Sequence, residues 1–355
     1  MKRLVIFTLM LALCCAVQPG ARADEPGLLL SFDGGTAWLN SKPLSLGDVR
    51  NKAVLVDFWN YTDISSLRML PYLKEWYKRY SPYGFEIVSI QSPDVAFEGQ
   101  TKDVEAAVEH YGVTWPVVID ANHAIADRYG LRYYPHLLLF DHNGFRILSI
   151  AHETDYPEIE SVIRLLMGAT HPEQPFGPVM PLLPQDSYLK PNALKYPVTP
   201  PIDMTSRSFI GNEQENPFGS GTDYTDVKPP HKDGVVYLQG PWRKLHNSIV
   251  SFSDNGYAAL HYHAIEVQAL MYHERGGSAT VLVTQNGQPV AKEDAGADIK
   301  YDAQGQSYVL VDMARSYDLI MNKRWGTYDL RLYPKAADVG IYHIEFETAE
   351  TGSDY

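Results

Sequence analysis

The chain has 355 residues, of which 45% are hydrophobic and 21% charged, and its formal net charge is −13. This length is sufficient for two domains that each have a core. The acidic balance argues against nucleic acid or an anionic membrane surface as a partner.

Residues 1–23 have the pattern of a secretory signal peptide, with basic residues first, an apolar run over 4–17 and the cleavage signal Ala21-Arg22-Ala23. The apolar run is too short to span a bilayer comfortably. Cleavage would remove the only two cysteines, Cys14 and Cys15. We therefore expect a periplasmic or secreted protein that is soluble after cleavage. A lipoprotein acylated at either cysteine is the less favoured alternative, because no small residue precedes them.

Residues 28–168 alternate apolar strands with helical stretches, which is the pattern of an α/β domain. Helices are expected over 66–80, 102–111, 125–129 and 157–167. Strands are expected at Val54–Phe58, Phe85–Ile90, Val117–Ile119 and His136–Phe140.

The segment after the first of these strands has the layout of a thioredoxin active site without its sulfur. In a redox thioredoxin, a buried strand ending in Phe-Trp leads into Cys-x-x-Cys at the start of a helix. Here Phe58-Trp59 leads to Asp63-Ile64-Ser65-Ser66, so Asp63 and Ser66 occupy the cysteine positions. Disulfide exchange requires a thiolate, and we therefore predict no catalytic residue at this site. Asp63 is expected to cap the helix by accepting a hydrogen bond from the amide of Ser65 or Ser66.

The expected binding groove lies beside these altered positions. Pro135 follows Tyr134 and precedes a second apolar strand, where a thioredoxin-like fold holds a cis proline facing the helix. The groove would be formed by Trp59, Asp63, Ser66, Tyr134 and Pro135. His136 could approach this pocket, although a lone histidine more often has a structural role. Glu98 lies in a loop. We favour a structural role for it over acid–base catalysis, because no second carboxylate is recognisably placed beside it.

Residues 169–232 form a proline-rich linker, because closely spaced prolines prevent a regular helix or a central strand. Its aromatic residues predict that parts of it dock on the domains; these residues are Phe176, Tyr188, Tyr196 and Phe209. Residues 233–349 carry short apolar runs separated by turn signals such as Asn286-Gly287, which is typical of an all-β sandwich.

Two features of the β-domain could bind ligands. Trp325 lies in a polar stretch and is the candidate for an exposed platform that binds a sugar ring or a peptide, although aromatic residues of sandwiches are more often in the core. His261 and His263 alternate along a strand and face one side. A metal needs at least three converging ligands, so we expect no metal site here and no cofactor.

The motifs of the first 140 residues resemble the DipZ-type, TlpA-like branch of thioredoxin-family proteins. The resemblance rests on the opening motifs, the flanks of the altered positions and the later landmarks, which are Trp38-Leu39-Asn40-Ser41, Pro43-Leu44-Ser45-Leu46, Leu70-Pro71-Tyr72-Leu73, Ser92-Pro93-Asp94, Ala96-Phe97-Glu98, Trp115-Pro116-Val117 and Tyr133-Tyr134-Pro135. It continues through Leu238-Gln239-Gly240-Pro241-Trp242, which is similar to the opening of the branch's C-terminal β-domain. The resemblance implies a jelly-roll fold like that of carbohydrate-binding modules for this domain.

These observations lead to two main alternative functions, and a third possibility is that the β-domain alone carries the function and the first domain is only a spacer. The leading hypothesis is an exported, redox-inactive thioredoxin-like protein that binds a peptide, a partner protein or an envelope glycan. The alternative is a member of the envelope thiol–disulfide oxidoreductase class, associated with cytochrome c biogenesis or redox homeostasis, that acts with the cysteines of a partner. Because Asp63 and Ser66 replace both redox cysteines, the branch's activity is not carried over to this chain.

Overall fold

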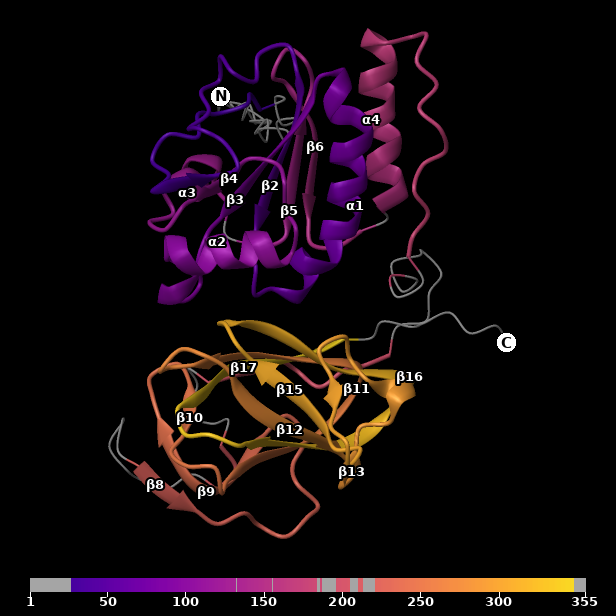
Figure 1. The fold of residues 1–355 in the computed structure, drawn as a ribbon. Helices are drawn as coiled ribbons and strands as arrows, with labels where there is room; N and C mark the ends of the chain where they lie inside the picture. Colours follow the sequence, from indigo (N-terminus) through magenta and orange to yellow (C-terminus); the bar gives the residue numbers. More distant parts are fainter. Residues whose placement is uncertain are drawn as a thin grey trace, which may run out of the picture.

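The computed structural model describes residues 27–131, 133–154, 156–183, 186, 196–204, 210–212 and 221–347. The expected signal peptide lies outside the described residues, as do Tyr188 and Phe209. An α/β domain and a β-rich domain are stacked on one another, with one end of helix α1 directed at the second domain (Figure 1). Within the described ranges, no helix has both the length and the apolarity needed to cross a membrane.

The first domain contains a mixed sheet flanked by helices. Its strands are β1 (Ala37–Leu39), β2 (Ala53–Trp59), β3 (Phe85–Gln91), β4 (Val117–Ile119), β5 (His136–Phe140) and β6 (Arg146–Ala151). Its helices are α1 (Ile64–Tyr80), η1 (Ser81–Tyr83), η2 (Ala96–Gly99), α2 (Thr101–His110), α3 (Ala124–Tyr129) and α4 (Tyr156–Thr170). The expected α/β domain is therefore confirmed.

The order of this sheet is β1-β4-β3-β2-β5-β6, with β2, β3 and β4 parallel and the others antiparallel to their neighbours. Strand β2 lies inside the sheet and all of its residues are buried, as its apolar run predicts. One core packs α1, α2 and α4 against one face of the sheet, and a smaller core packs α3 against the other. Strand β2 thus delivers the chain directly to the N-terminus of α1.

The second domain is built from antiparallel strands. They are β7 (Ile202–Asp203), β8 (Gly221–Tyr224), β9 (Val236–Lys244), β10 (Ile249–Ser251), β11 (Tyr257–His273), β12 (Ala279–Gln285), β13 (Gln288–Pro289), β14 (Lys300–Tyr301), β15 (Ser307–Val311), β16 (Arg315–Pro334) and β17 (Val339–Glu347), with the short helix η5 (Lys292–Asp294). The expected all-β domain is confirmed. Strand β11 pairs with β9 near its start and with β17 near its end. Such a change of partner, with bulges along β11 and β16, folds a sheet around its own core.

The expected linker docks on both domains, as its aromatic residues predict, and it also contributes strands β7 and β8 to the second domain. Phe176 packs against Tyr80 and Tyr83 of the first domain, with ring centroids 5.5 and 5.2 Å apart. Tyr196 stacks on Trp325 of the second domain at 5.4 Å.

Candidate functional site between the domains

The N-terminus of α1 carries a carboxylate cap. Asp63 has extended backbone angles, and its Oδ2 accepts the Ser66 N–H at 2.7 Å. The expected cap is therefore confirmed. The Ser66 hydroxyl is buried and accepts the Asn60 N–H at 3.3 Å. Burial raises the pKa of Asp63 above its ordinary value, and the hydrogen bonds from Ser66 oppose this rise.

Glu98 fastens the neighbouring loop to the turn that precedes α1. Its buried carboxylate accepts hydrogen bonds from Asn60 Nδ2 at 2.8 Å and from Thr62 Oγ1 at 2.5 Å. It also accepts the backbone N–H groups of Asp94 and Val95, at 2.6 and 3.0 Å. Both carboxylate oxygens thus have donors, and this residue has the structural role that the sequence favours.

The other residues of the expected groove lie away from the solvent-filled space at this site. Trp59 is a core residue with 1% of its surface exposed. The Tyr134–Pro135 peptide bond is cis, as expected, but neither residue lines the space beside Asp63. His136 is directed elsewhere and pairs with Ser149 on β6, with 3.0 Å between Nε2 and Oγ.

The second domain covers the turn before α1. Ser316 of β16 donates its hydroxyl to the Thr62 carbonyl at 2.5 Å. The Tyr342 ring of β17 packs against Phe97, with centroids 5.0 Å apart. The expected groove belongs to the first domain alone. The structure instead places the altered redox position beneath strands β16 and β17, more than 250 residues downstream.

An interdomain cavity of about 370 Å³ remains beside Asp63. Its lining contains five carboxylates and one imidazole but neither lysine nor arginine; the residues are Asn60, Thr62, Asp63, Asp94, Val95, Glu98, Pro201, Asp203, Asn247, Leu270, Tyr342, His343 and Glu345. Both domains and the end of the linker therefore contribute to one acidic pocket.

The pKa values of the ionisable groups in this cavity are shifted so that their uncharged forms are favoured. Burial, and then the charge of Asp63, raises the pKa of Glu345 to about 8. Burial lowers the pKa of His343 to about 4. The two groups face one another, with 3.4 Å between His343 Nε2 and Glu345 Oε1. Burial and the charge of Glu98 raise the pKa of Asp94 to about 6. Carboxylates that crowd together in a partly buried space behave in this way.

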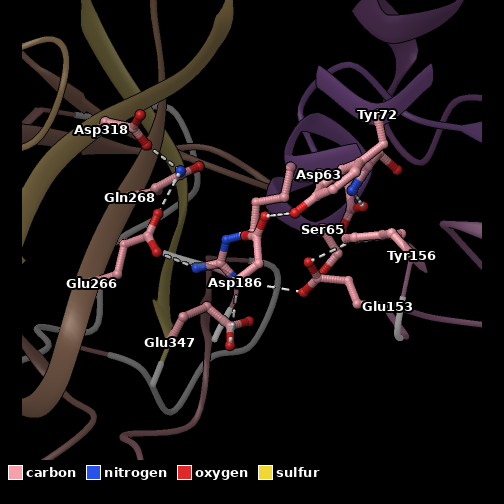
Figure 2. Close-up of polar contacts among 12 residues, drawn as sticks. Asp63, Ser65, Tyr72, Glu153, Tyr156, Asp186, Glu266, Gln268, Asp318 and Glu347 are labelled. Carbon is pink, nitrogen blue, oxygen red and sulfur yellow. Dashed lines mark hydrogen bonds and ion pairs between the residues drawn. The ribbon is translucent and has the colours of Figure 1, made fainter. Parts of the chain in front are cut away.

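An ion cluster lies beside the cavity and joins the domains. Arg68, in the second turn of α1, contacts Glu153 at 3.3 Å, Glu347 at 3.9 Å and Glu266. The Gln268 amide contacts both Glu266 and Asp318, and Figure 2 shows these acidic groups gathered at the domain boundary. Burial raises the pKa values of Glu347 and Asp318 to about 7.

The remaining candidate residues of the β-domain are engaged by the chain itself. The Trp325 ring stacks on Tyr196, and its Nε1 donates to the Pro197 carbonyl at 2.8 Å. One face of the expected platform therefore holds the linker. His261 pairs with Asp329 and His263 with Asp233. Across the described ranges, no group of three or more potential ligands is placed to hold a metal ion.

The residues that sequence reasoning misses are Arg68, His343 and Glu345. Alternation along β17 places His343 and Glu345 on one face, which is a signal that the sequence contains. Nothing in that alternation indicates which surface the face meets.

Comparison with known proteins matches each domain separately. Residues 34–145 match the AhpC/TSA family, and residues 205–346 match the family described as thioredoxin-like C-terminal domain. Protein DipZ from Mycobacterium tuberculosis is 28% identical over 283 residues, which is 76% of this chain. The chain spans 38% of the length of that protein.

Smaller relatives match the first domain alone. The thiol-disulfide oxidoreductase ResA from Bacillus anthracis is 27% identical over 126 residues, which cover 36% of this chain and 70% of ResA. Among solved structures, the thioredoxin domain of a thiol-disulfide oxidoreductase from Bacteroides vulgatus matches with 23% identity and a TM-score of 0.34, covering 40% of this chain and 97% of that domain.

Proposed function

We propose that this chain, a DipZ homologue that joins an AhpC/TSA family domain to a thioredoxin-like C-terminal domain, is an exported, redox-inactive protein that binds a polypeptide partner. The observation that carries the proposal is the carboxylate cap at the N-terminus of α1, where Asp63 accepts the Ser66 amide. A thiol–disulfide oxidoreductase needs a thiolate at this position. The chain has no cysteine beyond Cys15.

The interdomain cavity is the proposed binding site. Asp63 lines it from the first domain, and Tyr342, His343 and Glu345 line it from the second. Pockets that bind ligands occur preferentially at domain interfaces. Recognition would then need both domains, which gives the docked β-domain a role in binding.

A polypeptide is favoured over an envelope glycan by the chemistry of these surfaces. Sugar rings are commonly held on exposed aromatic faces, and one face of the candidate Trp325 is occupied by Tyr196. The cavity instead offers carboxylates, amides and apolar walls, which suit charged and aliphatic side chains.

The second candidate is an oxidoreductase-class protein that acts with cysteines supplied by a partner. The relatives favour it, because ResA is named a thiol-disulfide oxidoreductase. In that case the chain would position a partner's dithiol rather than supply its own.

Two assays on the chain from residue 24 onward test the proposal. We expect no acceleration of insulin reduction by dithiothreitol above the uncatalysed rate, and turnover would overturn redox inactivity. In crosslinking pull-downs from an envelope fraction, Asp63→Ala should lose partners that wild type captures. Asp329→Ala, whose carboxylate is exposed on the β-domain, is the matched control. A partner set unchanged by Asp63→Ala would refute this site.

A further inference from the structure

We propose that the interdomain cavity recognises an alkylammonium group, the side chain of a lysine presented by the partner polypeptide. This inference rests on the proposed function, because it names the group that the same site would bind. It depends on the charges that line the cavity, on an unsatisfied buried oxygen and on the size and walls of the pocket.

The charges are of one sign and come from both domains. Five of the lining residues are carboxylic acids, and the lining contains neither lysine nor arginine. Arg68 is nearby but does not line the cavity; it contacts Glu153, Glu266 and Glu347, and its charge only partly offsets the raised pKa values of Asp63 and Glu345. Carboxylates brought together in a partly buried space repel one another. A bound cation relieves that repulsion, and a second carboxylate or a neutral group does not.

An unsatisfied acceptor independently indicates a missing donor. Glu345 lines the cavity, and although the Ile64 amide reaches its carboxylate, its Oε2 is buried without a hydrogen-bond partner among the described residues. His343 Nε2 lies 3.4 Å from Oε1, the other oxygen of the same carboxyl group. Buried polar atoms in folded proteins are nearly always hydrogen-bonded. An ammonium group supplies three donors and no acceptor, which matches Glu345 once its carboxyl group has lost its proton. Glu98, by contrast, already has its donors.

The walls fit the stem of a lysine as well as its charge. The volume of about 370 Å³ lies in the range of small-ligand pockets. Leu270, Val95 and Pro201 provide apolar contacts for methylene groups, and Tyr342 provides an aromatic ring. Lysine buries its four methylenes along such surfaces while its charge reaches polar groups. A bare metal ion suits the site less well, because no described group of three ligands converges on one point.

The test compares probes that differ only in the ammonium group. Binding of Nα-acetyl-lysine N-methylamide and of the matched norleucine amide to the chain from residue 24 would be measured by ligand-detected NMR titration. We expect saturable 1:1 binding of the lysine probe. The affinity of the norleucine probe should be lower by roughly tenfold or more, because a charge-assisted hydrogen bond is lost. 1,5-Diaminopentane forms the third arm. If the diamine binds more weakly than the lysine probe, the ligand of the cavity is a lysine side chain. If the diamine binds more tightly, the ligand is a free diamine and the assignment to lysine is overturned.

Matched substitutions place the binding in the cavity. Glu345→Gln and Asp63→Asn keep the side-chain shape, and each should weaken the lysine probe roughly tenfold. Asp329→Asn should leave it unchanged, although it removes the same charge from this acidic protein. Circular dichroism would confirm that each variant is folded. At pH 7, calorimetry in two buffers should also detect proton release on binding, because the pKa of Glu345 is about 8 before a cation arrives.

The outcomes separate this inference from the proposed function. Equal affinity for the lysine and norleucine probes, or binding unaffected by both cavity substitutions, overturns the ammonium assignment. If Asp63→Ala still abolishes partner capture, the proposed function survives that failure. Insulin turnover together with intact lysine binding would overturn redox inactivity and leave the recognition chemistry standing.

Discussion

Replacement of Arg68 by methionine should uncouple the two domains. The Arg68 side chain is 8% exposed, and its partners Glu153 and Glu266 are 9% and 4% exposed. Removal of one member of a buried ion pair costs about 3–5 kcal/mol, because the remaining charges stay desolvated. Arg68→Met leaves three carboxylates without this guanidinium, one of them Glu347. We therefore expect docking to weaken by about 3–5 kcal/mol at pH 8.

The docking free energy lost in Arg68→Met should be larger at pH 8 than at pH 5. Burial raises the pKa values of Glu347 and Asp318 to about 7. A raised carboxyl pKa favours the docked state below the group's ordinary value, and this advantage is lost as pH rises through the raised value. Docking should therefore be tighter at pH 5 than at pH 8, in wild type as well. In Arg68→Met the carboxylates can take up protons at pH 5, so the loss of stability should be smaller there.

Urea unfolding and small-angle scattering at both pH values measure these effects. The control is Lys52→Met, which removes a more exposed ion pair with Glu86 inside the first domain and should cost at most about 1 kcal/mol. An interdomain role for Arg68 is refuted if Arg68→Met lowers the free energy of unfolding no more than Lys52→Met does, or if the decrease is the same at pH 5 and pH 8.

Three further outcomes are expected. Asp57→Asn should raise the free energy of unfolding in urea at pH 8 but not at pH 4, because burial raises the pKa of Asp57 to about 7. Each pKa unit represents about 1.4 kcal/mol. Equal effects at pH 4 and pH 8 would contradict this prediction. Gly340→Ala should lower the melting temperature of the β-domain, since a Cβ would collide with the Tyr272 ring and overpacking costs about 1–3 kcal/mol. Trp325→Ala should speed proteolysis of the linker near residue 196 and leave the unfolding of the first domain unchanged.

The helices and strands of the first domain could be predicted because their signals are local. The capping role of Asp63 follows from its position before a helical run, and the structure confirms it. Strand β11 shows the limit of such signals. The sequence has a short apolar run only over 258–262, whereas the strand continues to His273. Glu266 and Gln268 interrupt the apolar pattern, but both are buried, because the other domain covers them and supplies Arg68.

The binding site could be predicted only in part, for the same reason. Asp63 was identifiable from its neighbours in the chain. Its relation to Glu345 depends on how one domain sits on the other, and no local pattern encodes a contact between residues so far apart. The contact of Arg68 with Glu266 joins residues 198 positions apart. The predicted groove was consequently assigned to one domain, and the residues that complete the cavity were missed.

Two carboxyl groups lie at one positive helix end, where burial and the charge of Asp63 raise the pKa of Glu345. Asp63 caps α1 through the Ser66 amide, and Glu345 lies within reach of the Ile64 amide. The end of a helix carries roughly half a positive charge, which is too little to hold two ionised carboxylates in a buried space. Glu345, from the second domain, therefore keeps its proton near neutral pH. A cation that enters the cavity allows this proton to leave, so ligand binding and tight docking of the β-domain reinforce one another.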